Sequence, residues 1–255
     1  MSIFVDADTR VLVQGITGNE GRFWAQHMVE MGTRVVAGVT PGKGGQEVAG
    51  VPVFNTAREA VAETGADASV LFVPPRFVKD AFFEVIELGV KKLVVTAEGI
   101  PVQEALEMRH AALAAGATAL GGNTTGAVTP GSAMMGFIPY WIERVYTPGR
   151  ISVLTRSGSL TNEVTAMIVA SGFGISSLVG IGGDAVPLTR FAEVLPDLQK
   201  DPDTDAVVII GEIGGTMEEE VAEALEQQVL AKPLVAFIAG RTAAALTACT
   251  LPATN

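Results

Sequence analysis

The chain has 255 residues, of which 48% are hydrophobic, and its formal net charge is −11. This composition suits one large or two modest domains, while the negative charge argues against nucleic acids and anionic membranes as partners, because both need clustered basic residues. No apolar run reaches the roughly 18 residues of a membrane helix, and the first residues lack the features of a secretory signal. We therefore expect a cytoplasmic protein, and its single cysteine, Cys249, excludes an internal disulfide.

The first half of the sequence alternates between strand-like apolar runs and segments with helical spacing. This alternation predicts an α/β domain with a parallel sheet and helices on both faces. The expected strands cover residues 11–14, 33–39, 51–54, 68–73, 92–96 and 118–120, and the expected helices cover residues 22–31, 57–64, 77–88 and 103–115.

Residues 122–149 are rich in glycine and proline, which predicts an irregular linker. The alternation then starts again, with expected strands at 151–154, 176–181, 206–210 and 234–238 and an acidic helix at 217–228. The sequence therefore predicts two α/β domains, over residues 1–121 and 150–255, joined by the linker.

The turn GITGNEG, residues 15–21, follows the first strand and opens a helix, where backbone N–H groups hold phosphates. Ile16 stands where a dinucleotide fingerprint needs glycine, and the second strand is followed by no acidic residue for a ribose, so an NAD-dependent oxidoreductase is disfavoured. Lys43, within GVTPGKGG, suits a phosphorylated ribose such as that of coenzyme A. The alternative is a tight turn with Lys43 on the surface.

The second half repeats this geometry at RSGSLTNE, residues 156–163, where the amides of Gly158, Ser159 and Leu160 would face an anion. The alternative is an ordinary serine cap at Ser157. Glu212 directly follows a buried strand, where a carboxylate can orient an imidazole or simply cap the next helix. The two histidines, His27 and His110, fall on first-half helices and are expected to be surface or packing residues.

On these motifs the chain resembles the alpha subunit of succinyl-CoA synthetase, the succinate–CoA ligase family. The resemblance implies a Rossmann-like CoA-binding domain followed by a flavodoxin-like ligase domain. It also implies coenzyme A as cofactor, a small carboxylic acid as substrate, and a beta subunit whose ATP-grasp site uses ATP or GTP with magnesium in the tricarboxylic acid cycle. The motifs appear in the family's order, as GITGNEG, GVTPGKGG, PVFNTAREAV, EGIP, TRSGSLT, GIGGD, KDPDT and GEIGG.

The resemblance further implies the residues of the site, with no metal ligand in this chain. Ser157, Gly158 and Ser159 would receive the phosphoryl group of a phosphohistidine, and Glu212 would hold that histidine. The coenzyme A site would be lined by Thr17, Gly18, Asn19, Glu20, Lys43, Thr96, Ala97 and Glu98.

The sequence departs from the family pattern at three places. The family's GHAGA histidine loop would follow Thr242, but the tail reads differently, so we expect a truncated chain without the histidine nucleophile or the last strand and helix. The family's Asn-Cys-Pro-Gly loop reads Asn-Thr-Thr-Gly at residues 123–126. Asn162 replaces the family's tyrosine near the acid, which points to malate or a citrate-like acid. A catalytically inactive CoA-binding module is the alternative.

Overall fold

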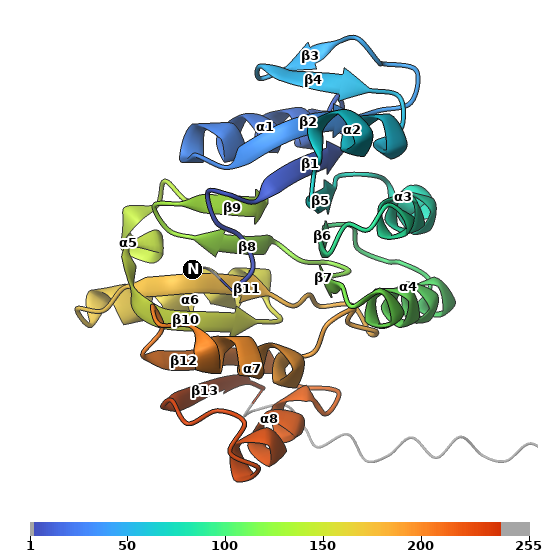
Figure 1. Ribbon diagram of the computed structural model, residues 1–255. Helices are drawn as coiled ribbons and strands as arrows, with labels where there is room; N and C mark the ends of the chain where they lie inside the picture. The colour runs from blue at the N-terminus through green and yellow to red at the C-terminus, as the bar shows by residue number, and fades with distance from the viewer. Residues whose placement is uncertain (1–2, 241–255) are drawn as a thin grey trace, which may run out of the picture.

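The structure is a computed structural model, and it describes residues 3–240 (Figure 1). Its first half builds a seven-stranded sheet in the order β3-β4-β2-β1-β5-β6-β7. Neighbouring strands run parallel except for β3, which pairs antiparallel with β4. The strands are β1 (Arg10–Gln14), β2 (Arg34–Val39), β3 (Glu47–Val48), β4 (Val51–Phe54), β5 (Ala68–Leu71), β6 (Lys92–Val95) and β7 (Thr118–Leu120).

Helices cover both faces of this sheet. Successive residues of a strand point to opposite faces, so neighbouring residues of β1 pack against different helices. Leu12 of β1 packs in a core with Phe82 and Met108, beneath α2, α3 and α4. Val13, its neighbour, belongs to a second core together with Met28 of α1. The helices are α1 (Asn19–Met31), α2 (Ala57–Thr64), α3 (Pro75–Glu87) and α4 (Val102–Ala115).

The expected linker contains regular structure, so the prediction of an irregular segment is wrong for part of residues 122–149. β8 (Gly126–Thr129) and β9 (Ala133–Gly136) form an antiparallel hairpin, and α5 (Glu143–Tyr146) follows it. A Cβ atom on Gly126 would lie 1.9 Å from the Met135 carbonyl oxygen, so the hairpin needs glycine for its close approach. The glycines that resembled a loop therefore close a strand pair.

The second half builds a six-stranded sheet in the order β13-β12-β10-β11-β8-β9, which includes that hairpin. The central pairs, β10 with β11 and with β12, are parallel, whereas β8 joins β11 antiparallel. The prediction about the tail after Thr242 lies outside the described residues. The further elements are β10 (Pro148–Thr155), α6 (Gly158–Ala170), β11 (Ile175–Gly180), α7 (Phe191–Lys200), β12 (Ala206–Glu212), α8 (Met217–Glu226) and β13 (Leu234–Ala239).

The hairpin forms one edge of the second sheet and packs beside α1, so it joins the two halves of the molecule (Figure 1). The Thr33 hydroxyl donates to the Met134 carbonyl oxygen at 2.9 Å and accepts the Met134 N–H at 2.9 Å. On the other side of the junction, Arg109 of α4 forms an ion pair with Glu193 of α7 at 2.5 Å. These contacts hold the two sheets in a defined orientation relative to each other.

Candidate functional site

A hollow of about 470 Å³ opens at the carboxyl ends of β1, β5 and β6. The chain leaves β1 toward β2 on one side, while β5 lies on the other side of β1. Such a switch point is where parallel sheets bind ligands. The lining residues are Gly18, Asn19, Glu20, Gly21, Phe72, Val73, Pro74, Thr96 and Phe137.

The turn after β1 is shaped so that backbone amides face this hollow. Gly15 has a φ of +77°, and a Cβ atom there would lie 2.2 Å from the Phe72 carbonyl oxygen, so the turn needs glycine to pass the end of β5. α1 then begins after Gly18, whose position carries no side-chain cap. The first N–H groups of α1 are therefore available for an anion such as a diphosphate.

The structure brings together four of the residues predicted to bind coenzyme A, since Gly18, Asn19, Glu20 and Thr96 line the hollow. Others lie nearby in the chain. Thr17 belongs to the same turn, and Ala97 and Glu98 follow Thr96, with the Ala97 carbonyl oxygen accepting the Asn123 N–H at 2.7 Å. Lys43 sits apart on the exposed turn after β2 and does not line the hollow.

A second hollow of about 150 Å³ lies where β10 and β11 end and α6 begins. Ser157 lines it, and its hydroxyl oxygen accepts the Leu160 N–H at 3.5 Å, so this serine is the N-cap of α6. The cap leaves the amides of Gly158 and Ser159 in the first turn for an anion. The lining residues are Asn123, Thr124, Thr125, Phe137, Thr155, Arg156, Ser157, Gly158, Gly180 and Gly182.

Arg156 lines the second hollow, and its guanidinium reaches the turn after β12, a contact that the sequence did not predict. Its side chain is only 11% exposed and lies 3.5 Å from the carboxylate of Glu218. Its guanidinium donates to the Gly214 carbonyl oxygen at 2.7 Å, and Glu218 accepts the backbone N–H of Glu212 at 3.2 Å. Glu212 is thereby placed at the end of β12, beside the strand that leads to Ser157.

Asn162 lies outside the second hollow. Its side-chain oxygen accepts a hydrogen bond of 2.7 Å from the hydroxyl of Tyr146, and burial raises the pKa of that tyrosine. Asn162 lines a different hollow between α5 and α6, together with Arg144 and Glu163. The structure therefore gives Asn162 a packing role, and its predicted role in acid binding stays a prediction.

Asp184, which follows β11, reaches back to the loop after β6 and was missed in the sequence. A Cβ atom on Gly122 would lie 2.6 Å from its Oδ2, so the carboxyl group fits closely against that glycine. Burial raises the pKa of Asp184 and the neighbouring Glu98 adds to this, while backbone N–H groups of Ile100 and Gly99 act in the opposite direction. No local sequence pattern predicts this contact, because it joins loops of two different sheets.

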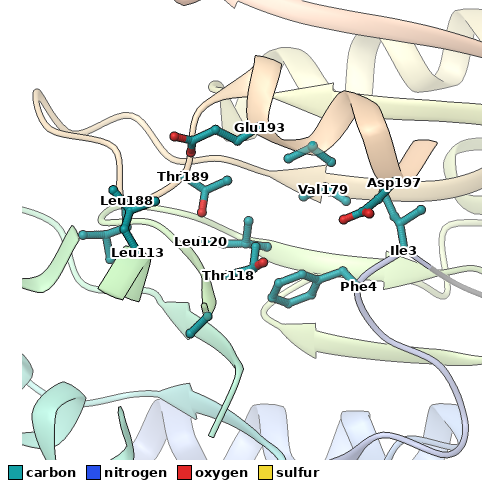
Figure 2. Close-up of a pocket in the computed structure, with 12 residues that line it drawn as sticks. Ile3, Phe4, Leu113, Thr118, Leu120, Val179, Leu188, Thr189, Glu193 and Asp197 are labelled. Atoms are coloured by element: carbon teal, nitrogen blue, oxygen red, sulfur yellow. The ribbon is translucent and has the colours of Figure 1, made fainter. Parts of the chain in front are cut away.

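Another cavity, of about 150 Å³, lies between the two halves of the molecule, away from the glycine turns (Figure 2). Leu113, Leu120 and Val179 line it together with the carboxylates of Glu193 and Asp197. None of the predicted site residues lines this cavity, so we place the candidate site at the first two hollows.

Comparison with known proteins identifies two matched segments in the chain. A CoA binding domain model matches residues 6–99, and a CoA-ligase model matches residues 154–248. The chain is 61% identical to the ADP-forming sulfoacetate-CoA ligase subunit SauD of Bilophila wadsworthia, over 95% of this chain and 83% of the relative. It is 47% identical to the succinate–CoA ligase subunit alpha 1 of Archaeoglobus fulgidus, over 95% and 82%.

A solved structure is similar along most of the chain. ATP citrate lyase from Methanothrix soehngenii, in complex with citrate and coenzyme A, superposes with a TM-score of 0.85 at 25% identity. The match covers 94% of this chain and 42% of that one. The family resemblance of the motifs and the α/β fold are thus confirmed. The chain belongs to the family of acid–CoA ligase subunits that includes the succinate–CoA ligase alpha subunits, and its first half is a CoA-binding domain.

Proposed function

We propose that this chain is the CoA-binding subunit of an ADP-forming ligase that joins sulfoacetate to coenzyme A. The observation that carries this proposal is the 61% identity to a sulfoacetate–CoA ligase subunit, against 47% to a succinate–CoA ligase subunit over the same share of the chain. A partner beta subunit with an ATP-grasp site supplies ATP and magnesium, and the complex works in the cytoplasm.

The second hollow supports a small, strongly anionic acid. Its volume of about 150 Å³ is sufficient for a two-carbon acid. Thr125 and Arg156 line it, and the Thr125 hydroxyl can donate a hydrogen bond to a sulfonate or carboxylate oxygen. The Thr124 hydroxyl is already used, because it donates to the Gly180 carbonyl oxygen at 2.6 Å.

The first hollow fits coenzyme A. The uncapped start of α1 suits the diphosphate, and the predominantly apolar floor formed by Phe72, Val73 and Pro74 suits the uncharged arm that ends in the thiol. Lys43, on the exposed turn beside this region of the sheet, is proposed to meet the ribose phosphate. Thr17, Ala97 and Glu98 complete the proposed binding surface.

In the proposed reaction, ATP converts the acid into an acyl phosphate, and the thiol of coenzyme A then forms the thioester and releases phosphate. Such an intermediate replaces one difficult condensation with two easier transfer steps. Ser157, Gly158 and Ser159 hold the phosphoryl group at the start of α6. Glu212 would orient a histidine that carries the phosphoryl group between these steps, as the family resemblance implies.

The test is the acid preference of the ligase reconstituted from this chain and its partner subunit. We expect kcat/KM for sulfoacetate to exceed the values for succinate, malate and citrate by about a hundredfold or more, measured as CoA-dependent ADP formation. A preference for any of these three acids would contradict the proposed substrate. Binding of coenzyme A without turnover of any acid would instead support the alternative of an inactive CoA-binding module.

A further inference from the structure

We propose that Phe137 is a positioning residue that guides the thiol of coenzyme A from the first hollow into the second. Phe137 lines both hollows, and it lies in neither of the segments matched by the two domain models. This inference rests on the proposed ligase function but not on the identity of the acid. The ring forms the wall along which the arm of coenzyme A passes toward the acyl phosphate.

The hairpin holds Phe137 in place through its backbone. The Phe137 N–H donates to the Thr125 carbonyl oxygen at 2.9 Å, directly after the tight glycine closure of β8 and β9. A Cβ atom on Gly136 would lie 2.1 Å from that same carbonyl oxygen, so the strands approach as closely as glycine allows. The position of the ring therefore follows from the close approach of β8 and β9 within the hairpin.

A line of aromatic side chains supports the ring from the side of α1. The Phe137 ring lies 6.1 Å from Trp24, which stacks on Trp141 at 6.0 Å. Trp24 donates its indole N–H to the carboxylate of Glu20 at 3.1 Å, and Glu20 itself lines the first hollow. Contacts of Trp24 therefore connect Glu20, at the turn proposed to bind the diphosphate, with the Phe137 ring.

The chemical step depends on this guidance. The thiol sulfur attacks the carbonyl carbon of the acyl phosphate, so that a C–S bond forms, the C–O bond to phosphate breaks, and the departing phosphate takes the thiol proton. Attack needs the two reacting atoms within a narrow range of distance and angle. Because the phosphates of coenzyme A are held elsewhere, loss of the ring should lower kcat and leave the affinity for coenzyme A nearly unchanged.

The experiment traps the thiol end of coenzyme A without needing the partner subunit or turnover. The reporter is Thr125→Cys in a Cys249→Ser background, because Thr125 lies in the second hollow with its methyl group over Gly158. The probe is the 2-pyridyl disulfide of coenzyme A. The introduced thiolate attacks the coenzyme A sulfur, a protein–CoA disulfide forms, and 2-thiopyridone leaves and is followed by its absorbance.

Three further substitutions are compared in this reporter chain at saturating probe. Phe137→Ala removes the wall, Phe137→Leu keeps an apolar but smaller one, and Phe173→Ala is the matched control. Phe173 is 60% exposed and lies between α6 and β11, at the opposite end of the second sheet from the hollow. Thermal unfolding verifies that each chain is folded, and Phe137→Leu serves if the alanine variant is not.

We expect trapping to be slower by about tenfold or more in Phe137→Ala, slowed to a lesser extent in Phe137→Leu, and unchanged in the control. The Kd for coenzyme A, measured by calorimetry, should stay within about threefold. Equal trapping rates, a loss that only follows a weaker Kd, or binding without any trapping in the reporter chain would overturn the positioning role and leave the proposed function standing. No binding of coenzyme A by the unsubstituted chain would overturn both.

Discussion

Substitution of Lys43 measures how much a single exposed charge contributes to the binding of coenzyme A. The turn that carries it is ordered, since the Lys43 N–H donates to the Thr40 carbonyl oxygen at 3.0 Å and the Gly44 N–H to the Asn55 side chain at 2.9 Å. We expect Lys43→Ala to weaken binding by about 1.5 to 3 kcal/mol, the value of a hydrogen bond to a charged group. That loss corresponds to roughly a ten- to hundredfold higher Kd by titration calorimetry.

Two controls make this prediction specific. Lys200→Ala removes an exposed charge from the last turn of α7, in the other half of the chain, and should leave the Kd unchanged. Dephospho-coenzyme A, which lacks the ribose phosphate, should bind equally to the wild type and to Lys43→Ala. If the substitution weakens both ligands alike, the lysine does not recognise that phosphate.

Asn162 is expected to act through the packing of α5 on α6. Asn162→Ala removes the acceptor of the buried Tyr146 hydroxyl, and an unpaired buried hydroxyl costs about 1 to 3 kcal/mol. Urea denaturation should show this loss, and Tyr146→Phe in the same background should recover part of it, because no hydroxyl then remains unpaired. A change in acid preference without a loss of stability would instead support the substrate role implied by the family resemblance.

Among the secondary-structure elements, the hairpin of β8 and β9 depends on an especially close approach of two backbone segments. Gly126→Ala would place a methyl group 1.9 Å from the Met135 carbonyl oxygen, at a φ of +97°. We expect a loss of at least about 2 kcal/mol in the free energy of unfolding, from strain and displaced strands together. Gly131→Ala is the matched control, because it has a φ of +76° in the same hairpin but a nearest contact of 3.6 Å. Equal losses in both variants would mean that the close approach is unimportant.

The sequence predicted the regular elements well and the hairpin poorly, for a physical reason. Residues 206–210 are apolar and buried or half-buried, and this local pattern is sufficient to identify a strand. The hairpin glycines allow two strands to approach closely, but in the sequence they have the composition of a loop. α1 begins at Asn19, three residues before the expected helix, because Gly18 offers no side-chain capping signal.

The candidate site was likewise predictable only where local sequence patterns define it. Turns at the ends of parallel strands converge at one edge of a sheet, so the sequence could place the glycine turn and Ser157 at the strand ends where the two hollows lie. Phe137 and Arg156 were missed because their roles depend on contacts between distant segments. Asp184 was missed for the same reason, since its carboxyl group meets a loop of the other sheet.

At the scale of the whole molecule, Asp184 makes the junction between the sheets sensitive to pH. The pKa of this carboxyl is raised above its ordinary value of 3.8 in the folded protein, so the folded state holds the proton more tightly than the unfolded chain. Stability contributed by this group is therefore present below its ordinary pKa and is lost as the pH rises through the raised folded pKa. Asp184→Asn should remove that loss.

The measurement is the free energy of unfolding in urea for the wild type and Asp184→Asn between about pH 4 and pH 7. The stability of the variant relative to the wild type should increase with pH over this window and then become constant. A relative stability that decreases as the pH rises would mean that Asp184 is stabilised in its ionised form, contrary to the burial of its carboxyl group.

A crystal structure of this chain with coenzyme A tests the central claim most directly, because it locates both ends of the ligand in one experiment. Our account predicts the diphosphate at the start of α1, the arm along the Phe137 ring, and the sulfur atom in the second hollow near Gly158. A ligand with its sulfur directed away from α6, or a ligand bound in the cavity of Figure 2, would contradict it.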